Sequence, residues 1–232
     1  MEKNDAFTYR RLRRAIGFLG ISLPITLVIF SQISFFKTEL QPSISHFYYT
    51  NLREIFTGTL CAVGLFLIRY KGFGNASWWK NDNLLTNVAG AMAFGVAFVP
   101  TNPEEGMGKG ITLIPSSAEW LGYLHYGFAA ALFLSFSLLA ICVFTIGQKK
   151  DSSIPVSVFN ENHIYRFCGY AIIVFILAIL VSNWVTLFDN STLILEALSL
   201  FCFGAAWLIK GRVLGDKGKV GRSLYREKHS KK

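Results

Sequence analysis

The sequence predicts an all-α integral membrane protein: a polytopic transmembrane helical bundle with six spanning helices and both chain ends in the cytoplasm. Of its 232 residues, 52% are apolar and only 16% are charged, whereas a soluble domain usually carries about a quarter charged residues. Six apolar segments are each about long enough to cross a bilayer. Basic residues concentrate in every second connecting segment, which is the pattern that membrane insertion produces.

The first three apolar segments each have a distinct boundary. We expect the first span over residues 15–36, because it is longer than the apolar part of a signal peptide and no small-residue cleavage site follows it. Pro24 lies in its middle and predicts a kink, which neighbouring helices tolerate. The second span is predicted over residues 52–68. The third is predicted over residues 84–99 and ends at Pro100.

The last three apolar segments follow a Gly- and Pro-rich connection. The fourth, residues 120–146, is the longest and is expected to be tilted. The fifth is predicted over residues 164–188, and the pair Asp189–Asn190 then makes a tight turn into the sixth, residues 193–209. None of these segments alternates apolar and polar residues as a strand would. We therefore expect a basic cytoplasmic arm (1–14), a transmembrane domain (15–209) and a basic cytoplasmic tail (210–232).

The distribution of Lys and Arg predicts the orientation. All but three of the 23 basic residues fall in segments on the side of the N-terminus, and the exceptions are Lys37, Arg53 and Lys109. Cytoplasmic loops carry the excess of Lys and Arg, so the N-terminal side is predicted to be cytoplasmic. The same distribution argues against nucleic acid as a partner, despite a net charge of +9. The basic tail is interpreted either as a topology determinant or as a binder of anionic lipids.

Cofactor and metal motifs are missing from the sequence. There is no phosphate-binding loop and no dinucleotide fingerprint. The four cysteines lie in apolar segments without metal-site spacing, and we interpret them as small buried side chains: Cys61, Cys142, Cys168 and Cys202. We therefore predict no cofactor, no metal site and no catalytic residue. We lean against an enzyme.

Polar residues at one membrane depth form the candidate site. Ionisable groups inside a membrane are costly and are functional candidates. His46, Arg53 and Glu54 lie around the start of the second span. His125 lies near the outer end of the fourth span and Glu196 near that of the sixth. Because a buried carboxylate needs a cation or strong donors nearby, we predict an outer-leaflet polar cluster of these five residues.

Two interpretations of this cluster stay open. It is either a clamp that pins three helices together or a pocket that binds a lipid or a protein partner of unknown identity. The second candidate function is a transporter of a small molecule or an ion, which polar residues at the bilayer midplane would favour. The third is an intramembrane hydrolase in which histidine and glutamate hold a metal ion.

Four stretches resemble an uncharacterised family of bacterial six-helix membrane proteins. They read SISHFYYTNLREIFTGTLCAVGLFLIRYKG, NVAGAMAFGVAFVPT, LHYGFAAALF and LEALSLFCFGAAWLIKG, and the resemblance as a whole covers about residues 10 to 211. The resemblance implies six helices and a location in the bacterial cytoplasmic (inner) membrane, and it carries over no particular enzymatic activity.

The order of features is also distantly similar to the damage-regulated autophagy modulator family. The matching positions are Ile44 and Ser45 in the first outer loop, His125 at the start of the fourth span and Glu196 in the last span. The Asp that follows Ile-Ser in that family is His46 in this chain. This resemblance implies a membrane role related to lipids.

Overall fold

The computed structural model describes residues 2–72, 74–103, 113–114, 120–146, 160–182, 184–185, 187–215 and 224, with side chains from residue 7 onward. Lys109 and most of the tail lie outside these ranges. The described residues are all-α, with six long helices and no strand. The long helices are α1 (Glu2–Ser31), α2 (Arg53–Arg69), α3 (Asp82–Phe98), α4 (Trp120–Leu138), α5 (Glu161–Ser182) and α6 (Ser191–Lys210). Three short 3₁₀ helices are η1 (Ser34–Phe36), η2 (Ser45–Tyr49) and η3 (Trp78–Lys80).

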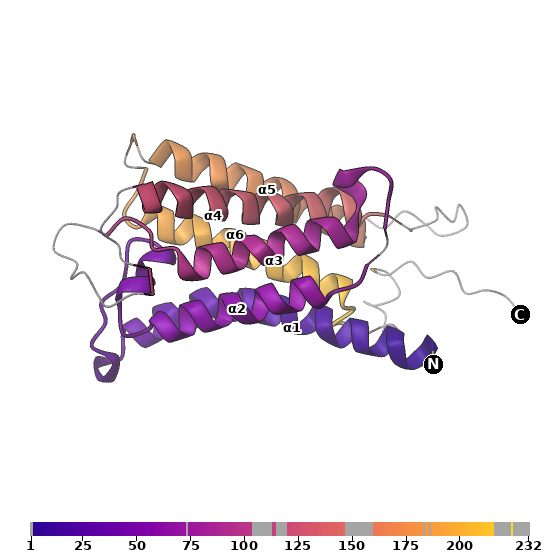
Figure 1. Ribbon diagram of the computed structural model, residues 1–232, viewed down its shortest axis with the longest axis horizontal. Helices are drawn as coiled ribbons and strands as arrows, with labels where there is room; N and C mark the ends of the chain where they lie inside the picture. The colour runs from indigo at the N-terminus through magenta and orange to yellow at the C-terminus, as the bar shows by residue number, and fades with distance from the viewer. Residues whose placement is uncertain are drawn as a thin grey trace, which may run out of the picture.

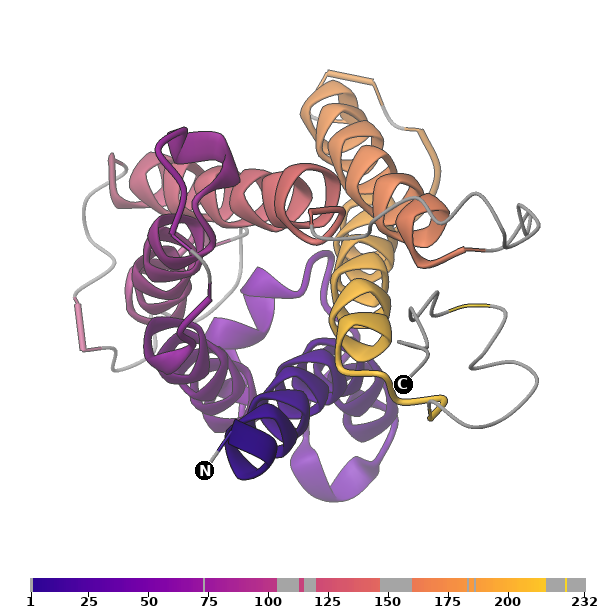
Figure 2. The same ribbon diagram turned by 90° about the vertical axis from the view of Figure 1, so that its right-hand side faces the viewer.

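The six helices run side by side along the long axis of the molecule (Figure 1). Seen along that axis they form a ring in chain order, in which each helix packs against the next and α6 returns to pack against α1 (Figure 2). We call the end with the α1–α2 connection and the start of α6 the loop end. The opposite end, with the start of α1 and the end of α6, is the basic end.

Four of the long helices have the length and apolar composition needed to cross a membrane. They cover Phe7–Ser31, Trp120–Val143, Glu161–Ser182 and Ser191–Lys210. Helices α2 and α3 are shorter, at 17 residues each, and at 1.5 Å per residue they extend for about 25 Å. The apolar core of a bilayer is about 30 Å thick. The structure therefore confirms the all-α prediction and gives four such helices rather than the expected six.

Helix boundaries differ most from the predicted spans at three ends, one of which is the end of α1 at Ser31, five residues before the predicted residue 36. Helix α1 begins at Glu2, so the basic segment expected as a separate arm continues the first helix through Pro24. Helix α5 ends at Ser182, six residues before the predicted end of the fifth span. Arginines in the N-terminal half of α1 are compatible with the helix because Arg13 and Arg14 hydrogen-bond to groups at the same end of the molecule.

Two glycine pairs let helix backbones approach closely. A Cβ atom on Gly17 of α1 would lie 2.8 Å from the Gly204 carbonyl oxygen of α6, and one on Gly204 would lie 2.7 Å from the Gly17 carbonyl oxygen. Gly64 of α2 and Gly90 of α3 repeat this arrangement, with distances of 3.0 and 2.7 Å. Small residues at such crossings drive helix association in membranes, where water cannot do so. The two pairs fix α1 on α6 and α2 on α3.

Helix α4 continues into one turn of π-helix, η4 (Leu139–Val143). In this turn the Phe144 amide donates to the Leu139 carbonyl, five residues back, at 2.8 Å. A π turn contains one residue more than an α turn, and such turns are frequent near functional positions. Below it, the fully buried Trp207 packs edge-on against Phe144 (5.1 Å between ring centroids) and Tyr70 (5.3 Å).

Candidate functional site

The carboxylate of Glu196 holds the first loop against α6. Its Oε2 atom accepts a hydrogen bond of 2.6 Å from the Ile44 amide, and the Ser45 amide donates to the same carboxylate. One turn earlier, the Leu193 amide donates to the Pro42 carbonyl at 2.9 Å. The sequence predicts a cluster in which Glu196 lies near Arg53 and His125. The structure instead gives it backbone donors, which are strong partners for an ionised carboxylate.

Ser43 and His46 form a second local contact in the same loop. The Ser43 hydroxyl lies 2.6 Å from Nδ1 of the His46 ring, and the same oxygen accepts from the His46 amide at 3.2 Å. A serine that accepts from the amide three residues later forms a local turn with its own side chain. This turn lies at the start of η2, and it holds His46 in the loop that lines the same cavity as Glu196.

A cavity of about 320 Å³ lies between this loop and helices α4, α5 and α6. The loop and the first turns of α6 supply polar side chains to its wall, namely Ser43, His46, Thr192 and Glu196. The rest of its wall is largely apolar and is lined by Pro42, Ser45, Tyr126, Ala129, Ala130, Phe133, Ile176, Ile179 and Leu180. Such a cavity suits a ligand that is apolar over most of its length and polar at one end.

His125 lies fully buried behind this cavity. Its Nδ1 atom is 2.7 Å from the Val99 carbonyl oxygen, and because a carbonyl can only accept, Nδ1 carries the proton. The other ring nitrogen, Nε2, is buried and has no hydrogen-bond partner among the described residues. His125 therefore joins the end of α3 to the start of α4, and it does not line the cavity.

Arg53 and Glu54 lie at a different place on the loop end. They line a shallow hollow of about 300 Å³ with Tyr48, Tyr49, Thr50 and Asn51. The Arg53 guanidinium lies over the Tyr48 ring, 5.4 Å from its centroid. The five residues of the predicted cluster are therefore divided. Glu196 and His46 share the cavity, His125 lies behind it, and Arg53 and Glu54 line a separate hollow.

Within the described ranges, no group of three or more His, Cys, Asp and Glu side chains is placed to hold a metal ion. Cys168 is buried and the other three cysteines are half-buried, all as free thiols.

A second polar network, which the sequence analysis did not predict, lies at the basic end. Arg13 of α1 donates to the Tyr70 hydroxyl at 2.7 and 3.2 Å, and that hydroxyl donates to Oδ2 of Asp82 at 3.2 Å. Tyr70 and Asp82 are both buried. Tyr70 follows α2 directly, and burial, the largest cause, raises its pKa to about 12. The network connects α1 to the α2–α3 connection.

Two further basic side chains at the same end of the molecule, Arg14 and Lys210, donate hydrogen bonds to backbone carbonyl groups. Arg14 donates to the carbonyl oxygens of Gly211 (2.8 Å) and Arg212 (2.7 Å), which follow the last turn of α6. The Lys210 ammonium donates to the Phe144 carbonyl at 2.9 Å, just after the π turn. Basic residues at a helix C-terminus satisfy its last carbonyl groups and suit the helix dipole. From the sequence, these basic residues are interpreted as determinants of membrane orientation. Their hydrogen bonds could not be predicted, because they depend on which helices pack together in the fold.

No family model, no curated protein and no solved structure matches this chain. The two family resemblances stated from the sequence therefore stay predictions.

Proposed function

We propose that this chain is a non-catalytic integral membrane protein that binds a lipid-like amphiphile in the cavity between the first loop and helices α4, α5 and α6. The observation that carries this proposal is the origin of the cavity wall. The first loop and the first turns of α6 supply Ser43, His46, Thr192 and Glu196, while helices α4 and α5 supply mainly apolar side chains.

The dimensions and position of the cavity support a ligand from the membrane. Its volume of about 320 Å³ is at the lower end of the range for small-molecule sites. Tyr126 of α4 and Leu180 of α5 line it and leave 48% and 51% of their surfaces exposed. Both belong to helices that are long and apolar enough to cross a membrane. An alkyl chain entering between these helices would exchange one apolar environment for another. The polar head of the same molecule would then lie near Glu196.

Occupancy can be tested by filling the cavity. Ala130 lines it, whereas a Cβ atom on Gly127, in the same helix, would meet nothing within 4 Å. We expect the purified protein, in bilayer discs made from a bacterial polar lipid extract, to retain an amphiphile in native mass spectrometry. The Ala130→Phe variant should lose it, and the matched Gly127→Phe variant should keep it. A wild-type protein that retains no amphiphile, or an Ala130→Phe variant that retains it fully, would contradict the proposal.

For the membrane placement, we propose that all six helices cross a bacterial inner membrane with both chain ends in the cytoplasm. The 17-residue helices α2 and α3 are each flanked at one end by a short helix, η2 and η3. Exposed basic residues gather at the basic end, among them Arg69, Lys71 and Lys80, which suits the cytoplasmic side.

The placement can be tested by labelling single cysteines in a chain from which the four native cysteines are removed. Glu39 at the loop end and Lys80 at the basic end are both exposed. In intact spheroplasts, a membrane-impermeant maleimide should label Glu39→Cys and should label Lys80→Cys only after permeabilisation. Labelling of both positions from outside, or of Lys80→Cys alone, would overturn the placement.

A transporter is the second candidate, and one observation favours it. Glu196, Ser45, Ala129 and Phe133 line both the large cavity and a void of about 30 Å³ among helices α1, α2, α3, α4 and α6. That void has room for about one water molecule, and its remaining lining is apolar. Uptake by proteoliposomes that Glu196→Gln abolishes, with binding intact, would favour transport over binding alone.

A further inference from the structure

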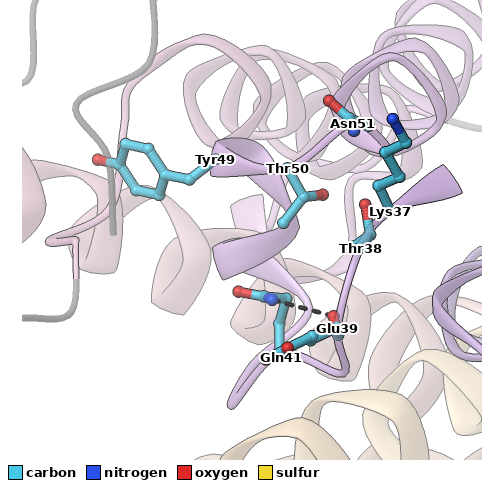
Figure 3. A pocket seen from close by; sticks show the side chains of 7 residues that line it. All are labelled: Lys37, Thr38, Glu39, Gln41, Tyr49, Thr50 and Asn51. Carbon is cyan, nitrogen blue, oxygen red and sulfur yellow. Dashed lines mark hydrogen bonds between the residues drawn. The ribbon is translucent and has the colours of Figure 1, made fainter. Parts of the chain in front are cut away.

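A separate polar hollow of about 270 Å³ lies at the loop end (Figure 3). Seven side chains from two stretches of the α1–α2 connection line it: Lys37, Thr38, Glu39, Gln41, Tyr49, Thr50 and Asn51. It has no lining residue in common with the apolar cavity. It therefore lies outside the proposed amphiphile site, and a ligand here has to be recognised by different chemistry.

The neutral donor side chains around this hollow each donate to a backbone carbonyl group. Thr38 Oγ1 and Asn51 Nδ2 each donate to the Phe36 carbonyl at 3.0 Å. Thr50 Oγ1 donates to the Phe47 carbonyl at 2.9 Å. The Tyr49 hydroxyl donates to the Thr101 carbonyl. A hydroxyl that has donated its hydrogen offers lone pairs in other directions, whereas the primary amides of Asn51 and Gln41 each keep a second N–H. The hollow therefore presents hydroxyl and carboxylate acceptors beside these amide N–H groups and the Lys37 ammonium.

Among the side-chain acceptors of the hollow that the structure describes, the oxygen of Gln41 is the one that is buried without a hydrogen bond. Its Nε2 atom donates to the Glu39 carbonyl at 2.9 Å (Figure 3). Because that carbonyl can only accept, the amide cannot be turned around, and Oε1 is the other atom. Gln41 is only 7% exposed, and its Oε1 is buried without a hydrogen-bond partner among the described residues. A buried acceptor without a partner is costly, so a ligand that donates to it would be favoured.

The charged groups around Gln41 are of both signs. The Glu39 side chain lines the hollow beside Gln41. Lys37 lines it as well and has a backbone φ of 45°, in the left-handed region. Such a conformation is unfavourable for residues other than glycine and, where it occurs, it often marks a functional position. A matching ligand therefore carries several N–H donors with positive charge and, a few bonds away, a negative group.

We propose that this hollow binds a primary ammonium group carried close to a phosphate, as in an aminoalkyl phosphate. The ammonium would donate to Gln41 Oε1 and the Glu39 carboxylate, and the phosphate would pair with Lys37. A quaternary ammonium has the same charge and no N–H group, so it cannot satisfy Gln41. The chemistry is that of a free aminoethyl phosphate and equally that of an aminoethyl phospholipid headgroup at the membrane surface.

The choice between a primary and a quaternary ammonium gives the first test. We would titrate the purified full-length protein calorimetrically with phosphoethanolamine and with phosphocholine. In parallel, we would measure binding to bilayer discs that contain phosphatidylethanolamine or only phosphatidylcholine. At least tenfold preference for the ethanolamine form is expected. Binding of free phosphoethanolamine would identify a soluble ligand, whereas a preference confined to discs would identify the lipid headgroup. Absence of binding in both formats, or equal binding of choline, would overturn the proposal.

Variants of two glutamines give the second test. Gln41→Met removes the buried acceptor and keeps the shape of the side chain, and it should weaken ethanolamine binding at least tenfold. Gln32→Met is the matched control, because Gln32 is exposed, does not line the hollow and hydrogen-bonds to Ser31. If Gln41→Met does not fold, Glu39→Gln replaces it, since Glu39 is exposed. Unchanged affinity in the folded variant would contradict the proposal. Neither variant touches the amphiphile cavity, so Ala130→Phe still tests that cavity separately.

Discussion

The backbones of Gly17 and Gly204 contact each other reciprocally: a Cβ atom on either residue would lie within 2.8 Å of the carbonyl oxygen of the other. Helices α1 and α6 are the first and last of the chain, so this contact closes the ring of helices. Because these two carbonyl oxygens are backbone atoms, rotating the neighbouring side chains of Ile21 and Leu208 would not by itself make room.

Substituting Ala for Gly204 should therefore separate α1 from α6. We expect the free energy of unfolding to fall by about 1–3 kcal/mol, as is usual for overpacking. The matched control is Gly58→Ala in α2, where a Cβ atom would meet nothing within 4 Å. Unfolding of both variants in mixed micelles should show a loss for Gly204→Ala alone. Equal stability of the two variants would disprove the close contact.

Glu196→Gln should weaken the attachment of the first loop to α6. Two backbone amides, of Ile44 and Ser45, donate to the carboxylate, and a glutamine offers one acceptor oxygen in place of two. We expect a loss of about 1–3 kcal/mol in stability, as for other charge-assisted bonds. Thermal unfolding should show this loss, whereas the control Glu54→Gln, at an exposed carboxylate, should change nothing. A stable Glu196→Gln variant that has lost the amphiphile would instead favour a role in binding alone.

Tyr70 should make the free energy of unfolding depend on pH in the alkaline range. Burial raises the folded-state pKa of Tyr70 to about 12 from its ordinary value of 10.0. Between these values the unfolded chain loses the proton while the folded chain keeps it, so the stabilising contribution is complete below pH 10 and is lost as pH rises towards 12. Two pKa units correspond to about 2–3 kcal/mol.

Tyr70→Phe provides the measurement. Without the hydroxyl, Arg13 and Asp82 lose the oxygen that connects them, and we expect lower stability at pH 8, by about 1–3 kcal/mol. The variant should also lose less stability than wild type when denaturant unfolding is repeated between pH 10 and 12. The same decline in both proteins would show that other groups cause it.

Lys210→Met should destabilise the π turn at the end of α4. The Lys210 ammonium donates to the Phe144 carbonyl and lies 5.4 Å from the Phe144 ring centroid. Methionine keeps most of the side-chain length and removes the donor, so the Phe144 carbonyl loses this partner. We expect a loss of about 1–3 kcal/mol in thermal unfolding. The control Lys80→Met, at an exposed lysine, should leave the transition in place.

The long helices could be predicted from the sequence, whereas the hydrogen-bond partners of the site residues could not. Apolar length identified all six long helices, because that signal is local, while α2 and α3 proved shorter than a typical span. Glu196 and His46 line the same cavity, and their common depth in a membrane stays a prediction. The amides of Ile44 and Ser45 as partners of Glu196 were not predictable, since every residue has an amide and only the fold selects which one is near. Arg13 and Asp82 were overlooked for a similar reason, since they meet only through Tyr70, in another part of the chain.

The π turn at Leu139–Val143 has a consequence for how this chain tolerates length changes. Removing one residue there would restore an ordinary α-helical repeat, and each residue of such a helix corresponds to a rotation of about 100°. All side chains after the deletion would turn by that angle around the α4 axis. Phe144 would then leave Trp207 and Tyr165, and its carbonyl would point away from Lys210. The extra residue thus acts as an angular spacer, and a deletion at this position should be far more damaging than any single substitution within the turn.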